Sequence, residues 1–128
     1  MKALHAAALA VLTFVAGAGA MWAQQHVKSN REPQFDNDRV EVWKSTIQPK
    51  QPLTYHRHDN YRVLVALTDG QLDMTDPSGK ILDTYHLVKG KAMWLSPNPP
   101  GQTHADVNPG AKPIEVMMIQ IKEAKDKK

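Results

Sequence analysis

The stretch that decides the fold is residues 99–108, which read PPGQTHADVN. Its prolines and glycine turn the chain and are poorly suited to the middle of a sheet. Residues 102–107 then form a short expected strand that carries His104, and the next turn begins at Asn108. This arrangement places one imidazole on a short strand between two turns.

Two further histidines lie upstream, at His56 and His58. On a strand, residues i and i+2 project from the same face, so both imidazoles could point into one cavity. With His104 from a second strand they would make a facial set of three nitrogen donors for a divalent transition metal. Imidazole ligands alone do not distinguish Fe, Mn, Zn, Ni and Cu.

The rest of the chain is a succession of short strands bounded by turn residues. Residues 61–67 (YRVLVAL) predict a buried strand, and Asp76-Pro77-Ser78-Gly79 predicts a hairpin turn. Further strands are expected at 39–47, from 71, and at 81–88, 92–95 and 114–121. No segment has a helical period and no repeat is visible, so an all-β sandwich or closed barrel is indicated.

The two histidine motifs, taken with these strands, resemble the cupins. The first motif of that family has His-x-His ahead of a strand and a glycine turn, here His56-Arg57-His58 and Gly70. The second has the form Pro-x-Gly-x-x-His-x-x-x-Asn, and residues 99–108 match it at every fixed position. The resemblance covers residues 39–122. It implies a small antiparallel double-stranded β-helix, a cupin-like jelly-roll barrel that is often dimeric, with His56, His58 and His104 binding the metal.

Three positions depart from the family pattern. Arg62 stands where a glutamate usually supplies a fourth ligand, Lys50 replaces the opening glycine of the first motif, and the loop after Gly90 is longer by three residues. A guanidinium cannot ligate a metal and would repel it. The substitution therefore leaves three outcomes open: a three-histidine site with free positions, an Arg62 that orients an anionic substrate by bidentate contact, or a cupin that has lost its metal.

The first 23 residues predict a secretory signal peptide. Lys2 supplies a positive start, an apolar stretch follows, and Ala20 and Ala23 offer alternative cleavage sites. The apolar stretch is shorter than the roughly 20 residues that a spanning helix needs, so no stable membrane span is expected after cleavage. Residues 24–38 are expected to form an irregular arm and residues 123–128 a charged tail. The predicted location is periplasmic or secreted, in a bacterium.

Composition narrows the chemistry further. The chain has no cysteine, which excludes disulfides and thiolate ligands. Loss of Lys2 with the leader lowers the formal net charge from +3 to +2, and no basic stripe interleaves with aromatic residues, so nucleic-acid binding is not expected. Tyr55, Tyr61 and Trp94 are interpreted as packing residues. Residues 62–67 are apolar on both faces, which, with the family resemblance, predicts a homodimer.

Two functions remain open from the sequence. In the first, the three histidines hold a metal that acts on a small, anionic molecule, and the family resemblance implies oxygenase-type chemistry or an isomerase-like role. In the second, the protein is a periplasmic small-molecule-binding cupin without turnover, which need not contain a metal. The fold hosts both kinds and does not decide between them.

Overall fold

The computed structural model describes residues 28–123, which contain strands, turns and bends but no helix. Eight strands follow one another along the chain: β1 (Asn30–Asp36), β2 (Val40–Ile47), β3 (Arg62–Ala66), β4 (Gly70–Thr75), β5 (Ile81–Leu87), β6 (Ala92–Leu95), β7 (Ala105–Val107) and β8 (Ile114–Ile121). The predicted signal peptide, the first part of the arm and most of the charged tail lie outside the described residues. No helix within residues 28–123 is long and apolar enough to cross a membrane.

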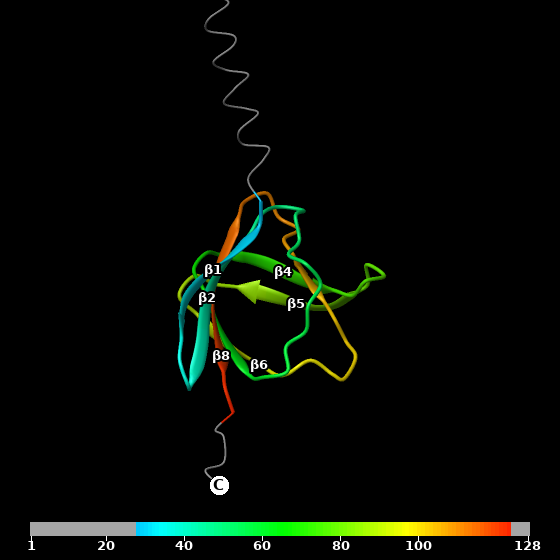
Figure 1. Ribbon diagram of the computed structural model, residues 1–128. Helices are drawn as coiled ribbons and strands as arrows, with labels where there is room; N and C mark the ends of the chain where they lie inside the picture. The colour runs from blue at the N-terminus through cyan, green and yellow to red at the C-terminus, as the bar shows by residue number, and fades with distance from the viewer. Residues whose placement is uncertain (1–27, 124–128) are drawn as a thin grey trace, which may run out of the picture.

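The strands form two antiparallel sheets. The larger has the order β1-β2-β8-β3-β6 and the smaller the order β5-β4-β7. In Figure 1, β4 and β5 of the smaller sheet run across the direction of β2 and β8. Consecutive strands repeatedly fall in different sheets, as in a jelly roll. The predicted all-β, double-stranded β-helix is therefore confirmed.

The core fills the space between the two sheets. The larger sheet contributes alternate residues of its central strands, such as Leu64 from β3 and Met118 from β8, and the smaller sheet contributes Leu72 and Met74 from β4. Ile47, at the end of β2, is fully buried. Successive side chains of a strand point to opposite faces, so the residues between these core positions face away from the barrel.

Strand β1 corrects the sequence interpretation. The expected irregular arm over residues 24–38 is wrong for Asn30–Asp36, which pair with β2 in antiparallel register. All seven residues are exposed, and the register shifts between Pro33 and Phe35. A strand without a buried face has no reason to alternate apolar and polar residues, so hydrophobic periodicity does not detect it.

One apolar row crosses the outer face of the larger sheet. Its members lie opposite one another in successive strand pairs: Phe35, Val42, Ile119, Val63 and Trp94. We call these five residues the outer apolar row. Its two ends are exposed, Phe35 by 55% and Trp94 by 58%. Of the three aromatic residues interpreted as packing, Tyr61 and Trp94 stack on each other with ring centroids 5.2 Å apart, but on the surface and not in the core, and Tyr55 is exposed as well.

Candidate metal centre

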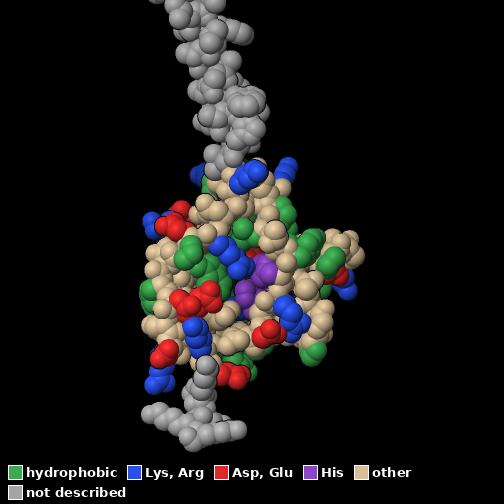
Figure 2. Space-filling view, in the orientation of Figure 1, with side chains coloured by type: hydrophobic (Ala, Val, Ile, Leu, Met, Phe, Trp, Pro, Cys, Tyr) green, Lys and Arg blue, Asp and Glu red, His purple; other side chains and the backbone are tan. Residues whose placement is uncertain are grey.

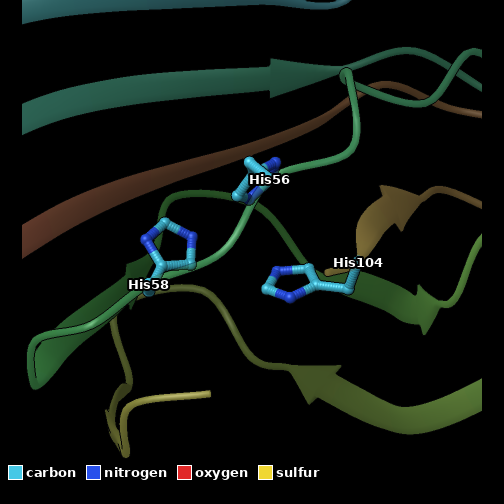
Figure 3. Close-up of side chains that lie close together, drawn as sticks. All are labelled: His56, His58 and His104. Carbon is cyan, nitrogen blue, oxygen red and sulfur yellow. The ribbon is translucent and has the colours of Figure 1, made fainter. Parts of the chain in front are cut away.

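His56, His58 and His104 come together inside the barrel. One nitrogen of each ring lies within 4.8 Å of a nitrogen of each other ring. The ring centroids are 4.7 Å apart for His56 and His58, 4.6 Å for His56 and His104, and 5.5 Å for His58 and His104. Figure 3 shows the three rings converging from two chain segments. His58 and His104 are buried, and His56 is partly exposed.

The backbone fixes two of these histidines directly against each other. His56 donates its backbone N–H to the carbonyl of His104 at 2.9 Å, and His104 donates to the carbonyl of His56 at 2.8 Å. This isolated antiparallel bridge joins the segment between β2 and β3 to the segment before β7. The His-x-His segment is therefore not part of a regular strand. The two rings meet because their main chains pair at one point.

The proline-rich corner positions the third histidine. The side-chain oxygen of Asn98 accepts the backbone N–H of His58 at 2.6 Å, and the N–H of Asn98 donates to the carbonyl of His58 at 2.8 Å. Nothing in the sequence distinguished Asn98, because a polar residue among prolines is ordinary in a turn. Only the fold places this amide beside a residue forty positions upstream.

The asparagine that ends the second motif has a structural role. Asn108 is 1% exposed, and its side-chain amide donates to the carbonyls of Ile47 and Lys112 at 3.0 and 2.7 Å. Its side-chain oxygen accepts the backbone N–H of Gly110 at 2.9 Å. Both ends of the amide are thus satisfied by backbone groups, which locks the turn after β7 and leaves Asn108 no part in the metal centre.

Burial keeps two of the imidazoles neutral. It lowers the pKa of His58 to about 2, and the positive charge of Arg62 and the neighbouring histidines act in the same direction. Burial also lowers the pKa of His104, although the carboxylate of Asp106 opposes the shift. A metal binds the unprotonated nitrogen of imidazole. These two ligands therefore need not release a proton at neutral pH.

Arg62, the predicted substrate-orienting residue, lies inside the barrel. It is 3% exposed, its Nη2 donates to the carbonyl of Ser96 at 3.2 Å, and its Nε is buried without a partner within residues 28–123. Burial lowers the pKa of Arg62, whereas Tyr85 and Asp106 raise it. The Arg62 guanidinium therefore retains an N–H donor close to the histidines, which an anion-binding residue needs.

Arg31 is a site residue that the sequence did not reveal. Its Nη2 lies 3.0 Å from Nε2 of His56, while Nδ1 of that histidine lies 2.7 Å from the carbonyl of Thr54. The Arg31 guanidinium also lies over the ring of Trp43, 5.2 Å from its centroid. Trp43 in turn stacks with His58 at 6.2 Å. The residue was missed because β1 is fully exposed and its sequence resembles an irregular arm.

Two carboxylates near the histidines behave differently. Asp106 is two residues from His104 and its Oδ1 lies 3.5 Å from Nε2 of His104, with side chains 14% and 4% exposed. Asp59, although next to His58 in sequence, pairs with Arg57 and its side chain is 70% exposed. Asp106 is therefore the carboxylate that can act on the centre, whereas Asp59 is held by Arg57.

A cavity of about 250 Å³ opens beside His104. It is lined by Met74, Leu82, Asp83, Tyr85, Asn98, Gln102 and His104. Met74 and Leu82 form the apolar part of the lining and the other residues present polar groups, and the volume suits a small, polar molecule. Figure 2 shows the histidines at a depression of the surface, with Lys and Arg side chains close by.

The donor set fits a divalent transition metal. Three imidazoles from one concave site match three-histidine metal centres, in which the remaining positions stay open to water or substrate. The predicted ligands His56, His58 and His104 are thus the residues that the fold brings together. His86 is exposed on β5 and belongs to no such group within the described residues.

Several solved structures share the architecture of this protein. A cupin domain from Bordetella pertussis Tohama I is 29% identical and superimposes with a TM-score of 0.62, over 75% of this chain and 95% of that one. A double-stranded β-helix protein from Klebsiella pneumoniae gives a TM-score of 0.54 at 18% identity, over 75% and 74% of the two chains. An RmlC-like cupin from Methanocaldococcus jannaschii gives 0.56 at 13% identity, over 73% and 80%.

No family model matches the sequence, and no curated protein matches it either. The structure and its solved neighbours nevertheless define the fold: the protein is an all-β double-stranded β-helix, similar to cupin domains, with a three-histidine cluster that could hold a metal.

Proposed function

We propose that this protein is an exported cupin that binds one divalent transition metal through His56, His58 and His104 and acts on a small anionic molecule by oxygenase-type chemistry. The convergence of three imidazole nitrogens within 4.8 Å of one another carries this proposal. A bound metal of this kind supplies Lewis-acid and, for Fe, Mn or Cu, redox chemistry at its open positions.

The chain's own residues bind and orient the molecule. Arg62 offers a buried guanidinium with free hydrogen-bonding capacity, which suits a carboxylate group. Tyr85 lines the cavity beside His104, and burial raises the pKa of its phenol, so it stays protonated and can donate a hydrogen bond to the molecule. The apolar walls Met74 and Leu82 limit water on that side of the cavity.

A binding role without turnover is the second candidate. Within residues 28–123, the protonatable groups near the three histidines are Asp106, Tyr85 and the exposed Asp83, and the buried charge of Arg62 acts on Asp106 and Tyr85. A site with so few groups to move protons is well suited to holding an anion. The two candidates share the metal ligands and differ in whether the bound molecule is converted.

Elemental analysis of the purified protein tests the metal. We expect near-stoichiometric metal in the wild type, or after loading with Fe, Mn, Zn, Ni or Cu, and none in the His56→Ala/His104→Ala variant. His86→Ala is the matched control, because His86 is exposed on β5, and it should retain full metal content. A wild type that takes up none of these metals would contradict the proposal. Oxygen uptake with small carboxylates then separates the enzyme from the binding protein.

The exported location is part of the proposal and rests on the leader-like residues 1–23. Expression of the full chain in a bacterium, followed by fractionation and intact-mass measurement, tests it. Cleavage after Ala20 or Ala23 with recovery from the periplasm is the expected result. Retention of the full mass in the cytoplasm would contradict it.

A further inference from the structure

We propose that Arg31 changes partner when the site is filled: it holds Nε2 of His56 while no metal is bound, and it binds the carboxylate of the ligand once the metal has taken that nitrogen. This inference rests on the proposed metal site. It adds a residue from β1 to the site and assigns to the ligand an acidic group on the β1 side of the metal.

The first step concerns the proton on His56. Its Nδ1 lies 2.7 Å from the carbonyl oxygen of Thr54, which can only accept, so Nδ1 carries the proton. Nε2 of the neutral ring then has one lone pair, and Nη2 of Arg31 donates to it at 3.0 Å. A metal needs the same lone pair. Arg31 and the metal therefore compete for one atom.

The second step is that Arg31 can leave. It lies on β1, an edge strand exposed at every residue and paired only with β2. Within residues 28–123 it has no carboxylate within salt-bridge distance, and its guanidinium rests on the face of Trp43. A cavity of about 310 Å³ lies beside it, lined in part by Pro33, Phe35 and Trp43. The Arg31 side chain can therefore stay in contact with Trp43 and has free space beside it in which to change rotamer.

The third step is charge. Three neutral imidazoles add nothing to the charge of a divalent metal, and Arg31 and Arg62 each add one positive charge nearby. Asp106 contacts His104, and the exposed Asp83 lies at the rim of the same cavity, so few carboxylates balance this positive charge. An anionic ligand relieves the excess positive charge, and a guanidinium released beside it can pair with a carboxylate through two hydrogen bonds. Arg62 is buried and Arg31 is exposed, so the two guanidinium groups lie at different depths around the histidines.

The variant Arg31→Met separates these effects, because methionine keeps apolar contact with Trp43 and removes the donor. Calorimetric titration with Zn²⁺ in a buffer of low anion content should show affinity about tenfold higher than wild type, since a charged donor no longer competes for Nε2. Titration of malonate into the Zn²⁺-loaded variant should show affinity about tenfold lower, since one guanidinium is lost. Arg31→Gln should lie between wild type and Arg31→Met in both titrations.

Arg57→Met is the control, because Arg57 lies between the two histidines in sequence but pairs with Asp59. It should change neither affinity. The inference requires that Arg31→Met raise the Zn²⁺ affinity and lower the malonate affinity. A general loss of structure in Arg31→Met would lower both affinities and would overturn the inference. An unchanged Zn²⁺ affinity would overturn it as well. If the wild type itself binds no Zn²⁺ or other divalent metal, the proposed function fails first, and the inference fails with it.

Discussion

The main chains of His56 and His104 form an isolated antiparallel bridge, with hydrogen bonds of 2.9 and 2.8 Å between their backbone groups. Backbone pairing thereby fixes the relative positions of two candidate ligands that are far apart in sequence. Asn98 adds the third position by bonding both backbone groups of His58. The site is therefore preformed, and changes to its backbone partners should be felt as changes in metal affinity.

Asn98→Ala removes the oxygen that accepts the backbone N–H of His58 at 2.6 Å. We expect metal affinity to fall about tenfold, because residues that orient a ligand typically contribute that much. The unfolding free energy should fall by about 1 kcal/mol for the lost hydrogen bond. Calorimetry and urea unfolding measure the two effects. Gln102→Ala, which changes the same cavity without touching His58, should leave metal affinity near wild type.

Asp106→Asn should weaken metal binding by about one order of magnitude. The carboxylate lies 3.5 Å from Nε2 of His104, so its negative charge stabilises a cation held by that ring. Competition with a fluorescent chelator gives the affinity. Asp83→Asn changes an exposed carboxylate at the rim of the same cavity and serves as the comparison. Equal effects of the two substitutions would mean that only the overall charge matters.

Acid should destabilise the metal-free protein. Burial lowers the pKa values of His58 and His104 below the ordinary 6.5, so the unfolded chain takes up protons first as the pH falls. The stabilising contribution is present above pH 6.5 and is lost below it. For each of the two histidines, we expect the unfolding free energy to fall by up to about 2 kcal/mol when the pH is lowered from 7 to 5.

Urea unfolding at the two pH values measures this loss. His58→Asn has no imidazole to protonate at that position and should show a smaller loss than wild type. A wild type whose unfolding free energy is the same at pH 7 and pH 5 would show that the two histidines titrate normally.

Arg62→Met should separate stability from binding. A buried guanidinium with an unpaired Nε is costly to desolvate, so an apolar side chain of similar length should leave the unfolding free energy within about 1 kcal/mol of wild type or raise it. Binding of malonate to the metal-loaded protein should nevertheless fall about tenfold or more. Arg62→Lys should not restore it, because an ammonium lacks the planar fork. A strong loss of stability in Arg62→Met would instead assign Arg62 a structural role.

The outer apolar row predicts a homodimer. Phe35 and Trp94 expose large side chains at its two ends, and a second copy of this chain would cover them. Trp94→Lys should shift the molar mass measured by light scattering from dimer to monomer, because the charge cannot be buried against the apolar row. Val88→Lys, at a hydrophobic residue exposed elsewhere, should not change the mass. A wild-type protein that is monomeric at every concentration would contradict the prediction.

The sequence by itself determined the class of fold and the identities of the three clustered histidines. Short alternating runs between proline and glycine turns can only bury their apolar faces in a layered β structure. The histidines stood out because their spacing, with Pro99, Gly101 and Asn108, follows two motifs in the correct order.

Tertiary structure alone decided what surrounds those histidines. Arg31 reaches His56 from a strand that buries nothing, and Asn98 holds His58 across a turn, so neither leaves a periodic signal in the sequence. Asp106 became the relevant carboxylate because it faces inward two residues after His104, whereas Asp59 is drawn outward by Arg57. Periodicity reports which side chains are buried, but contacts between distant segments depend on how the two sheets close.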